Sequence, residues 1–347
     1  MFAYNYSCYY FTEWVQYGQL TYSQFAVVAF LNGITILPAI ILNGLILVSI
    51  WRTPALHTPA MALVFNLAIS DFFVGFLAQP VMMAWFAVEL KATEMQSTYC
   101  YMSITMIVSS TFFSCSSFFV VTAIAVDRFL ALYYHLRYPT IMTMRKAVAV
   151  SLVTWFASLF VIALRLTVGT KYRAVFSVFN SSLVATCELV VLFSYFKIYR
   201  ILRKHQKQIH SANIGLELTL ASPDSTEESI SQTSLTQPQK SIRQYRKSII
   251  SSFYIYFAFI LCYFPAICVL IYYSATDDHR VSAYFTKIAF CILVINSAIN
   301  PGIYCWKMRE LRNAVRQTLI RLRGITGLKT QRKFFPKRAV KAAWTMS

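Results

Sequence analysis

The last long apolar stretch of the chain ends with Asn296-Ser297-Ala298-Ile299-Asn300-Pro301-Gly302-Ile303-Tyr304. Two amides, a hydroxyl and a proline stand here inside sequence that is otherwise apolar. Polar side chains within a membrane span are costly and usually have a function. A proline inside a helix removes a backbone hydrogen bond and bends the helix. The stretch therefore predicts a kinked membrane helix that carries a functional polar cluster.

The composition of the chain indicates a membrane protein. Of its 347 residues, 57% are hydrophobic and 13% are charged, whereas soluble domains are about 45–50% apolar and about 25% charged. About 20 apolar residues cross a bilayer as a helix, and a helix satisfies its own backbone groups in hydrocarbon. Seven such windows occur, at approximately 26–50, 60–88, 101–126, 147–168, 176–199, 248–273 and 281–305. We therefore predict an all-α membrane protein, a seven-transmembrane helix bundle with a short amphipathic inner-face helix.

The basic residues predict the orientation of the bundle. Placing the N-terminus outside puts 26 of the 32 Lys and Arg residues on the cytoplasmic side. Because positive residues are retained in cytoplasmic loops, we expect a multi-pass protein of the plasma membrane with its N-terminus outside and its C-terminus in the cytoplasm. The formal net charge of +19 then favours anionic membrane lipids over nucleic acid as a partner.

This topology divides the chain into three parts. Residues 1–24 are expected to form an extracellular N-terminal tail, 25–306 the seven-transmembrane bundle, and 307–347 an amphipathic helix and a basic cytoplasmic tail. Within the bundle, residues 206–240 are polar and poor in aromatic side chains, a composition typical of disorder. We therefore predict a disordered third intracellular loop at about 206–240.

Two features of the extracellular side concern covalent modification. The sequence Asn5-Tyr6-Ser7 is an acceptor site for N-glycosylation. Of the eight cysteines, Cys8 and Cys100 are those expected to face the oxidising side, where disulfides form and persist. A disulfide between Cys8 and Cys100 is therefore a hypothesis.

The second apolar window carries an acid, Asp71. A charge at this depth costs roughly 2.5–3.5 kcal/mol on insertion scales, so Asp71 should face the bundle interior and find polar partners. The candidate partners lie in the first, third and seventh windows and are Asn43, Ser117, Asn296, Ser297 and Asn300. Oxygen ligands with one carboxylate suit a hard cation such as Na⁺, and a hydrated hydrogen-bond network without an ion is the alternative. No other cofactor is expected.

Two further patterns stand at the inner half of the predicted bundle. Asp127 and Arg128 are adjacent opposite charges at the end of the third window. If they pair, releasing the pair frees a guanidinium that can donate hydrogen bonds to another protein. The sixth window carries Phe259 and Cys262-Tyr263-Phe264-Pro265, and a proline kink there lets a small local change swing the helix end.

These motifs follow one another in the order of the windows: Asn43, Leu67-Ala68-Ile69-Ser70-Asp71, Asp127-Arg128-Phe129, Trp155, Cys262-Tyr263-Phe264-Pro265 and Asn300-Pro301-Gly302-Ile303-Tyr304. Together they resemble the rhodopsin-like (class A) G-protein-coupled receptors, over about residues 25–320. The resemblance implies an outer pocket for an extracellular ligand and an inner cleft for a heterotrimeric G protein, which opens by outward movement of the sixth helix. It also implies arrestin and receptor kinases as partners, and no catalytic activity.

The resemblance assigns the coupling of ligand binding to the G protein to eight residues. They are Asp127, Arg128, Tyr195, Phe259, Tyr263, Pro265, Pro301 and Tyr304. Tyr245 stands where the family usually has an acid at the start of the sixth span, so the usual lock to Arg128 is missing. We therefore expect raised basal activity.

Departures from the family pattern suggest a branch. The usual proline of the fifth span aligns with Cys187, and the usual cysteine at the top of the third span would fall at Ser103. In lacking both features, the sequence is similar to the branch that contains the melanocortin, cannabinoid and lysophospholipid receptors. The run from Leu132 to Lys146 is similar to melanocortin receptors in particular, although the acids that those receptors use to bind calcium and basic peptides are absent.

The predicted ligand pocket is apolar and uncharged. By its position in the family it is lined by Ser110, Thr111, Tyr263, Phe264 and Ile267. An amine receptor would have an aspartate where Ser110 stands. A small apolar or lipid-like ligand is therefore slightly preferred over a peptide. A seven-span transporter or ion channel is the alternative function, and it is disfavoured because no internal repeat is visible.

Overall fold

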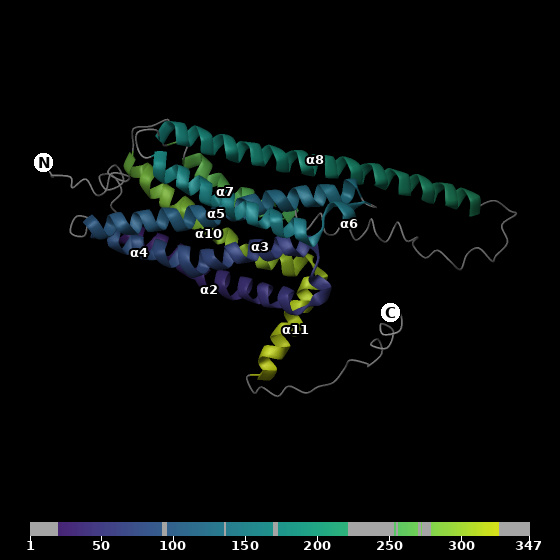
Figure 1. The fold of residues 1–347 in the computed structure, drawn as a ribbon, viewed down its shortest axis with the longest axis horizontal. Helices are drawn as coiled ribbons and strands as arrows, with labels where there is room; N and C mark the ends of the chain where they lie inside the picture. Colours follow the sequence, from purple (N-terminus) through teal and green to yellow (C-terminus); the bar gives the residue numbers. More distant parts are fainter. Residues whose placement is uncertain are drawn as a thin grey trace.

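The computed structural model describes residues 20–91, 96–134, 137–168, 173–220, 253–254, 256–269, 272 and 279–325. Its helices are α2 (Tyr22–Arg52), α3 (Pro59–Phe73), α4 (Gln79–Glu89), α5 (Gln96–Tyr133), α6 (Tyr138–Ile141), α7 (Met144–Val168), α8 (Arg173–Leu220), α10 (His279–Lys307) and α11 (Arg309–Ile325), with a 3₁₀ turn η2 (Pro54–Leu56) and a π turn η3 (Val74–Ala78). Figure 1 shows the long helices running side by side. The described residues contain no strand.

Six helices of the described chain are long and apolar enough to cross a membrane, with α3, η3 and α4 counted as one span, Pro59–Glu89. A seventh, shorter apolar helix covers Tyr256–Val269. The predicted all-α membrane bundle is therefore confirmed. Its seven apolar windows correspond to these seven helices.

Local sequence explains where the first two spans begin. The Thr21 hydroxyl accepts a hydrogen bond from the backbone of Gln24, and the Gln24 side chain accepts one from the backbone of Thr21. This capping box satisfies backbone donors that a helix start leaves unpaired. At the start of α3 the Thr58 hydroxyl accepts a hydrogen bond from the backbone of Met61, and Pro59 occupies the first helical position, where its missing N–H costs nothing.

The second span is not a regular helix, because the π turn η3 interrupts it. Gly75 of this turn packs closely against α2: a Cβ atom added to Gly75 would lie 2.8 Å from the Ala39 Cβ. Only glycine allows so close an approach of the two helices. Wider π turns are frequent at functional sites, and this one separates the part of the span that holds Asp71 from the part that ends at Glu89.

The core consists of two main apolar clusters. One lies toward the predicted inner end and includes Leu67, Ile124, Phe259, Tyr304 and Leu311. The other lies toward the predicted outer end and includes Val28, Trp85, Phe86, Met106 and Val294. Outward-facing apolar side chains such as Phe156 and Leu189 are largely exposed, as expected for a surface that contacts lipid.

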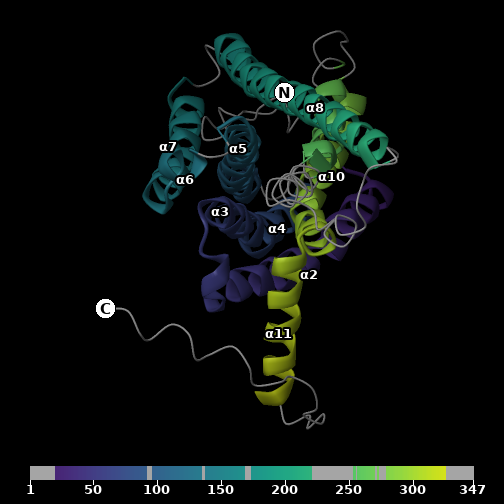
Figure 2. The ribbon, with the colours of Figure 1, turned by 90° about the vertical axis from the view of Figure 1, so that its right-hand side faces the viewer.

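The predicted inner end differs from the sequence expectation in one respect. Helix α8 continues to Leu220, so the part of the predicted disordered loop from 206 to 220 is helical. Figure 1 shows α8 extending past the other helices, and Figures 1 and 2 show α11 leaving the bundle at a steep angle. α11 is joined to α2 by the Thr318 hydroxyl, 3.1 Å from that of Ser49, and Leu311 is fully buried. Residues 1–19, 221–252 and 326–347 lie outside the described part of the chain.

Candidate functional site

The buried carboxylate of Asp71 collects hydrogen bonds from two other spans. The Ser117 hydroxyl of α5 donates to it at 3.3 Å, the Ser297 hydroxyl of α10 at 2.9 Å, and the Asn300 amide of α10 at 2.7 Å. Hydrogen bonds to an ionised group contribute about 1.5–3 kcal/mol each. The predicted clustering of polar residues around Asp71 is therefore present, and it ties three helices together.

Two predicted members of this cluster have other contacts. The Asn43 amide donates to the Ser297 backbone carbonyl at 2.9 Å, which links α2 to α10. Asn296 is buried, and its amide oxygen accepts no hydrogen bond from the described residues. Ser70, which the sequence did not single out, joins the cluster through the Ser117 hydroxyl at 3.0 Å.

The donor set fits a small hard cation. It offers one carboxylate, the hydroxyl oxygens of Ser117 and Ser297, and the amide oxygen of Asn300, which is buried and accepts no hydrogen bond from the described residues. The amide oxygens of Asn43 and Asn296 are also buried and accept no hydrogen bond from the described residues. Na⁺ and similar ions prefer oxygen ligands of this kind. Within the described residues no cluster of three or more His, Cys, Asp or Glu side chains is found, so these residues offer no comparable set for a transition metal.

At the predicted inner end, Asp127 and Arg128 form a buried ion pair. The Arg128 guanidinium lies 3.5 Å from the Asp127 carboxylate. The Tyr138 hydroxyl of α6 donates to the same carboxylate at 2.7 Å. The Arg128 side chain is 10% exposed and the Asp127 side chain 1% exposed. The pair anticipated from the sequence is thus present, and α6 supplies a third member.

Aromatic contacts join the other predicted coupling residues. The rings of Phe259 and Tyr263 stack at 4.0 Å between centroids, and Phe118 of α5 lies 5.4 Å from Phe259. The Tyr263 hydroxyl donates to the Ser114 carbonyl at 3.3 Å. Tyr304 is fully buried, with a hydroxyl that has no hydrogen-bond partner among the described residues.

The two prolines and Tyr195 complete the predicted coupling set. Pro301 is buried inside α10, and Pro265 lies inside the helix Tyr256–Val269. Tyr195 of α8 stacks on Tyr256 with 5.4 Å between ring centroids. The sixth helix is therefore in contact with α5 through Phe259 and Tyr263, and with α8 through Tyr256.

The predicted ligand-pocket residues are only partly brought together. The Ser110 hydroxyl donates to the Met106 backbone carbonyl, and Ser110, Thr111 and Tyr263 are half-buried. Phe264 and Ile267, in contrast, are 59% and 45% exposed. The structure therefore does not enclose these two side chains in a pocket.

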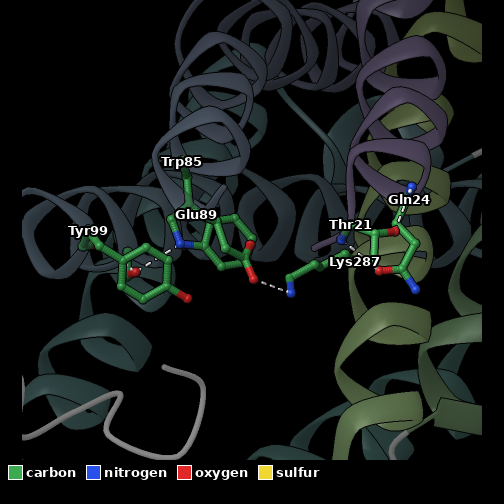
Figure 3. A network of polar contacts seen from close by, with 7 residues as sticks. Thr21, Gln24, Trp85, Glu89, Tyr99 and Lys287 are labelled. Atoms are coloured by element: carbon green, nitrogen blue, oxygen red, sulfur yellow. Dashed lines mark hydrogen bonds and ion pairs between the residues drawn. The ribbon is translucent and has the colours of Figure 1, made fainter. Parts of the chain in front are cut away.

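A buried ion pair at the predicted outer end was missed by sequence reasoning. The Lys287 ammonium of α10 donates to the Glu89 carboxylate of α4 at 2.5 Å, and the two side chains are 2% and 1% exposed. Figure 3 shows the two groups facing each other beside Trp85. The Lys287 ammonium lies 5.8 Å from the centroid of the Trp85 ring. The outer half of the bundle therefore contains buried charge, contrary to an uncharged reading of this region.

Hydrogen bonds fix the position of the Trp85 ring beside this ion pair. The Trp85 indole N–H donates to the Ser103 hydroxyl at 2.8 Å, and Ser103 donates to the Tyr99 backbone carbonyl. A sequence signal did exist: Lys287 is the one Lys or Arg in the seventh apolar window, and Glu89 directly follows the second.

The predicted modifications of the extracellular side are tested only in part. Cys100 is disulfide-bonded, whereas the other described cysteines are free. Cys8 and the glycosylation site Asn5 lie outside the described residues. The Cys8–Cys100 pairing and the use of Asn5 remain predictions.

Comparisons with known proteins identify the class. The sequence matches the family described as "7 transmembrane receptor (rhodopsin family)" over residues 42–189 and 171–304. The chain therefore belongs to the rhodopsin family of seven-transmembrane receptors. The predicted class, a G-protein-coupled receptor that is not an enzyme, is confirmed, as is the multi-pass membrane topology in general terms.

The individual relatives are distant receptors. The octopamine receptor beta-1R of Drosophila melanogaster is 26% identical over 84% of this chain, which spans 61% of that relative. The histamine H2 receptor of Canis lupus familiaris is 24% identical over 79% of this chain and 74% of its own length. The human olfactory receptor 51L1 is 34% identical over 34% of this chain. None of these belongs to the predicted melanocortin, cannabinoid and lysophospholipid branch.

Proposed function

We propose that the protein binds an extracellular ligand and activates a heterotrimeric G protein by outward movement of the sixth helix. The observation that carries this proposal is the buried Asp127–Arg128 pair at the predicted inner end. A guanidinium held this way is released only when its surroundings open, and it then offers donors to a partner protein. The proposal takes the N-terminus as extracellular and the C-terminus as cytoplasmic, in a plasma-membrane protein.

The Asp71 cluster is proposed to bind Na⁺ and to link the two ends of the bundle. Asp71, Ser117, Ser297 and Asn300 would hold the ion, with Asn296 close by in sequence as a further oxygen donor. The bound ion would neutralise the buried carboxylate and keep α3, α5 and α10 together. A rearrangement of α10 would disturb both this cluster and Tyr304, which lies one helical turn beyond Asn300.

The ligand is proposed to be small and apolar or lipid-like, with a peptide as the weaker candidate. Ser110 offers no charge for an amine, and its hydroxyl already donates to the Met106 carbonyl. The amines named in two of the relatives are therefore not assigned to this chain. A ligand that reaches the predicted outer end would meet the Glu89–Lys287 pair. The melanocortin, cannabinoid and lysophospholipid branch stays part of this proposal.

Further partners are proposed at the cytoplasmic face. Arrestin and receptor kinases would follow from the receptor class. Anionic lipids of the inner leaflet would bind α11, whose apolar residues Leu319, Ile320 and Leu322 are exposed among arginines such as Arg316 and Arg321. A basic amphipathic helix of this kind lies in the membrane interface.

The proposed function is tested in cells that express the full chain together with reporters for each class of G protein. We expect basal signalling above that of mock-transfected cells, and we expect Arg128→Ala to reduce it to the mock level while surface expression is kept. Arg145→Ala, which removes an exposed arginine at the same end of the bundle, is the matched control and should keep the signal. Full signalling by Arg128→Ala would contradict the proposal.

A further inference from the structure

Glu188 of α8 is an acid within a membrane span, and the receptor motifs assign it no role. The Tyr256 hydroxyl donates a hydrogen bond to the Glu188 carboxylate at 2.5 Å. Tyr256 belongs to the helix Tyr256–Val269 and is 5% exposed. An ionisable residue in a span is functional by default, and the partner that the described residues give Glu188 is the Tyr256 hydroxyl of the neighbouring helix.

The surroundings of this hydrogen bond place it between the fifth and sixth helices. The Tyr195 ring of α8 stacks on the Tyr256 ring, with an interplanar angle of 22°. Glu188 and Tyr195 are seven residues apart, so they share one face of α8. Tyr256 shares a face with Phe259 and Tyr263 for the same reason. The hydroxyl is therefore attached to the side of the sixth helix that packs into the bundle.

A second contact holds the start of the sixth helix from the other side. The Lys307 ammonium at the end of α10 lies 3.9 Å from the centroid of the Tyr254 ring and 3.4 Å from that of Trp306. Cation–π contacts contribute about 0.5–2 kcal/mol, according to their exposure to water. Because Tyr254 and Trp306 are partly exposed, the hydrogen bond to Glu188 is the better shielded of the two contacts.

At the predicted inner end, the sixth helix is packed against the rest of the bundle. Arg128 is buried against Asp127, and Phe259 is buried against Phe118 of α5. An outward movement of the sixth helix must separate Phe259 from Phe118. Because Tyr256 is one turn nearer the moving end, the same movement changes its distance to Glu188.

We propose that the Tyr256–Glu188 hydrogen bond is the lock that holds the sixth helix in its resting position. This hydrogen bond replaces the usual lock between Arg128 and an acid, because this chain has Tyr245 in the place of that acid. Tyr256 and Glu188 are then positioning residues for receptor activation. The inference rests on the proposed function, because it concerns the same movement. A contact present equally in both states would shift nothing, so the bond must be weaker or absent once the helix has moved.

The test removes the hydrogen bond with minimal change in shape. Tyr256→Phe deletes the hydroxyl alone, and Glu188→Gln removes the charge that it meets. Basal G-protein signalling per receptor at the cell surface should rise in both variants. Losing a hydrogen bond to a charged group shifts the ratio of active to resting receptor by about tenfold or more. Glu188→Gln keeps an amide oxygen that can accept the hydrogen bond, so it should weaken the interaction less than Tyr256→Phe does. The double variant should signal no more than Tyr256→Phe, because both substitutions act on the same interaction.

Tyr254→Phe is the matched control. It removes a hydroxyl two residues away on the same helix, and it keeps the ring that Lys307 contacts. Its basal signalling should equal that of the wild type. If Tyr256→Phe leaves basal signalling unchanged while Arg128→Ala abolishes it, the lock is wrong and the proposed function stands.

A distance measurement between helices tests the proposed lock without a G protein. Spin labels at Arg145 and Phe257, both exposed, report the separation of α7 from the sixth helix in purified full-length protein. Tyr256→Phe should add a population at longer distance that Tyr254→Phe lacks. If no variant signals but this population appears, the proposed G-protein function fails and the lock stands. Identical distance distributions in Tyr256→Phe and the wild type would overturn the lock.

Discussion

Replacing only one residue of the Glu89–Lys287 pair should destabilise the bundle. Lys287→Met leaves the Glu89 carboxylate in a site where it is 1% exposed and where one of its oxygens already has no hydrogen-bond partner among the described residues. Removing one partner of a buried ion pair costs about 3–5 kcal/mol. For large domains, 1 kcal/mol shifts Tm by about 2–4 °C, so Tm should fall by at least about 6 °C.

The assay is thermal unfolding of the protein in detergent, followed with a dye that reacts with thiols such as the buried Cys291. The double variant Glu89→Gln with Lys287→Met leaves no unpaired charge, and it should regain at least half of the lost Tm. Lys91→Met removes an exposed lysine close to Glu89, and it should change stability by less than about 0.5 kcal/mol. A double variant that melts below Lys287→Met would refute the reasoning, because the two charges would then not be coupled.

Two further substitutions test the polar cluster and the π turn. Asp71→Asn should abolish any rise of Tm when Na⁺ replaces choline in the buffer, because the carboxylate is the one charged ligand of the proposed site; a rise equal to that of the wild type would exclude Asp71 as an ion ligand. Gly75→Ala should lower stability by about 1–3 kcal/mol, as overpacking does, since its Cβ would lie 2.8 Å from that of Ala39. Gly33→Ala, where an added Cβ meets nothing within 4 Å, is the control and should not lower Tm.

The cluster around Asp71 could be anticipated because a carboxylate in an apolar window has few possible hydrogen-bond partners. Only interior-facing polar residues can satisfy it, and the sequence offers few of these: Ser117, Ser297 and Asn300 are bonded to it. The Glu89–Lys287 pair was harder to foresee, because both residues stand near window ends, where charged side chains usually reach water. Glu89 and Lys287 are 198 residues apart, and no local pattern relates them.

The extent of α8 shows a different limit of sequence reasoning. Residues 206–220 are polar and lack aromatic side chains, which suggested a disordered loop. The same residues include Gln206, Lys207, Gln208, Ala212 and Leu216, which have high helix propensity. A helix that is already nucleated in the membrane extends at little cost, so composition alone did not determine where α8 ends.

The π turn at Val74–Ala78 sets the rotation of everything that follows it in the second span. Each residue of an α-helix turns the chain by about 100°. Inserting or deleting one residue in this turn would redirect Trp85 and Glu89 to another side, while Asp71, which precedes the turn, would keep its neighbours. A change of length in this one segment can thus alter the side chains presented at the predicted outer end without moving the Asp71 cluster.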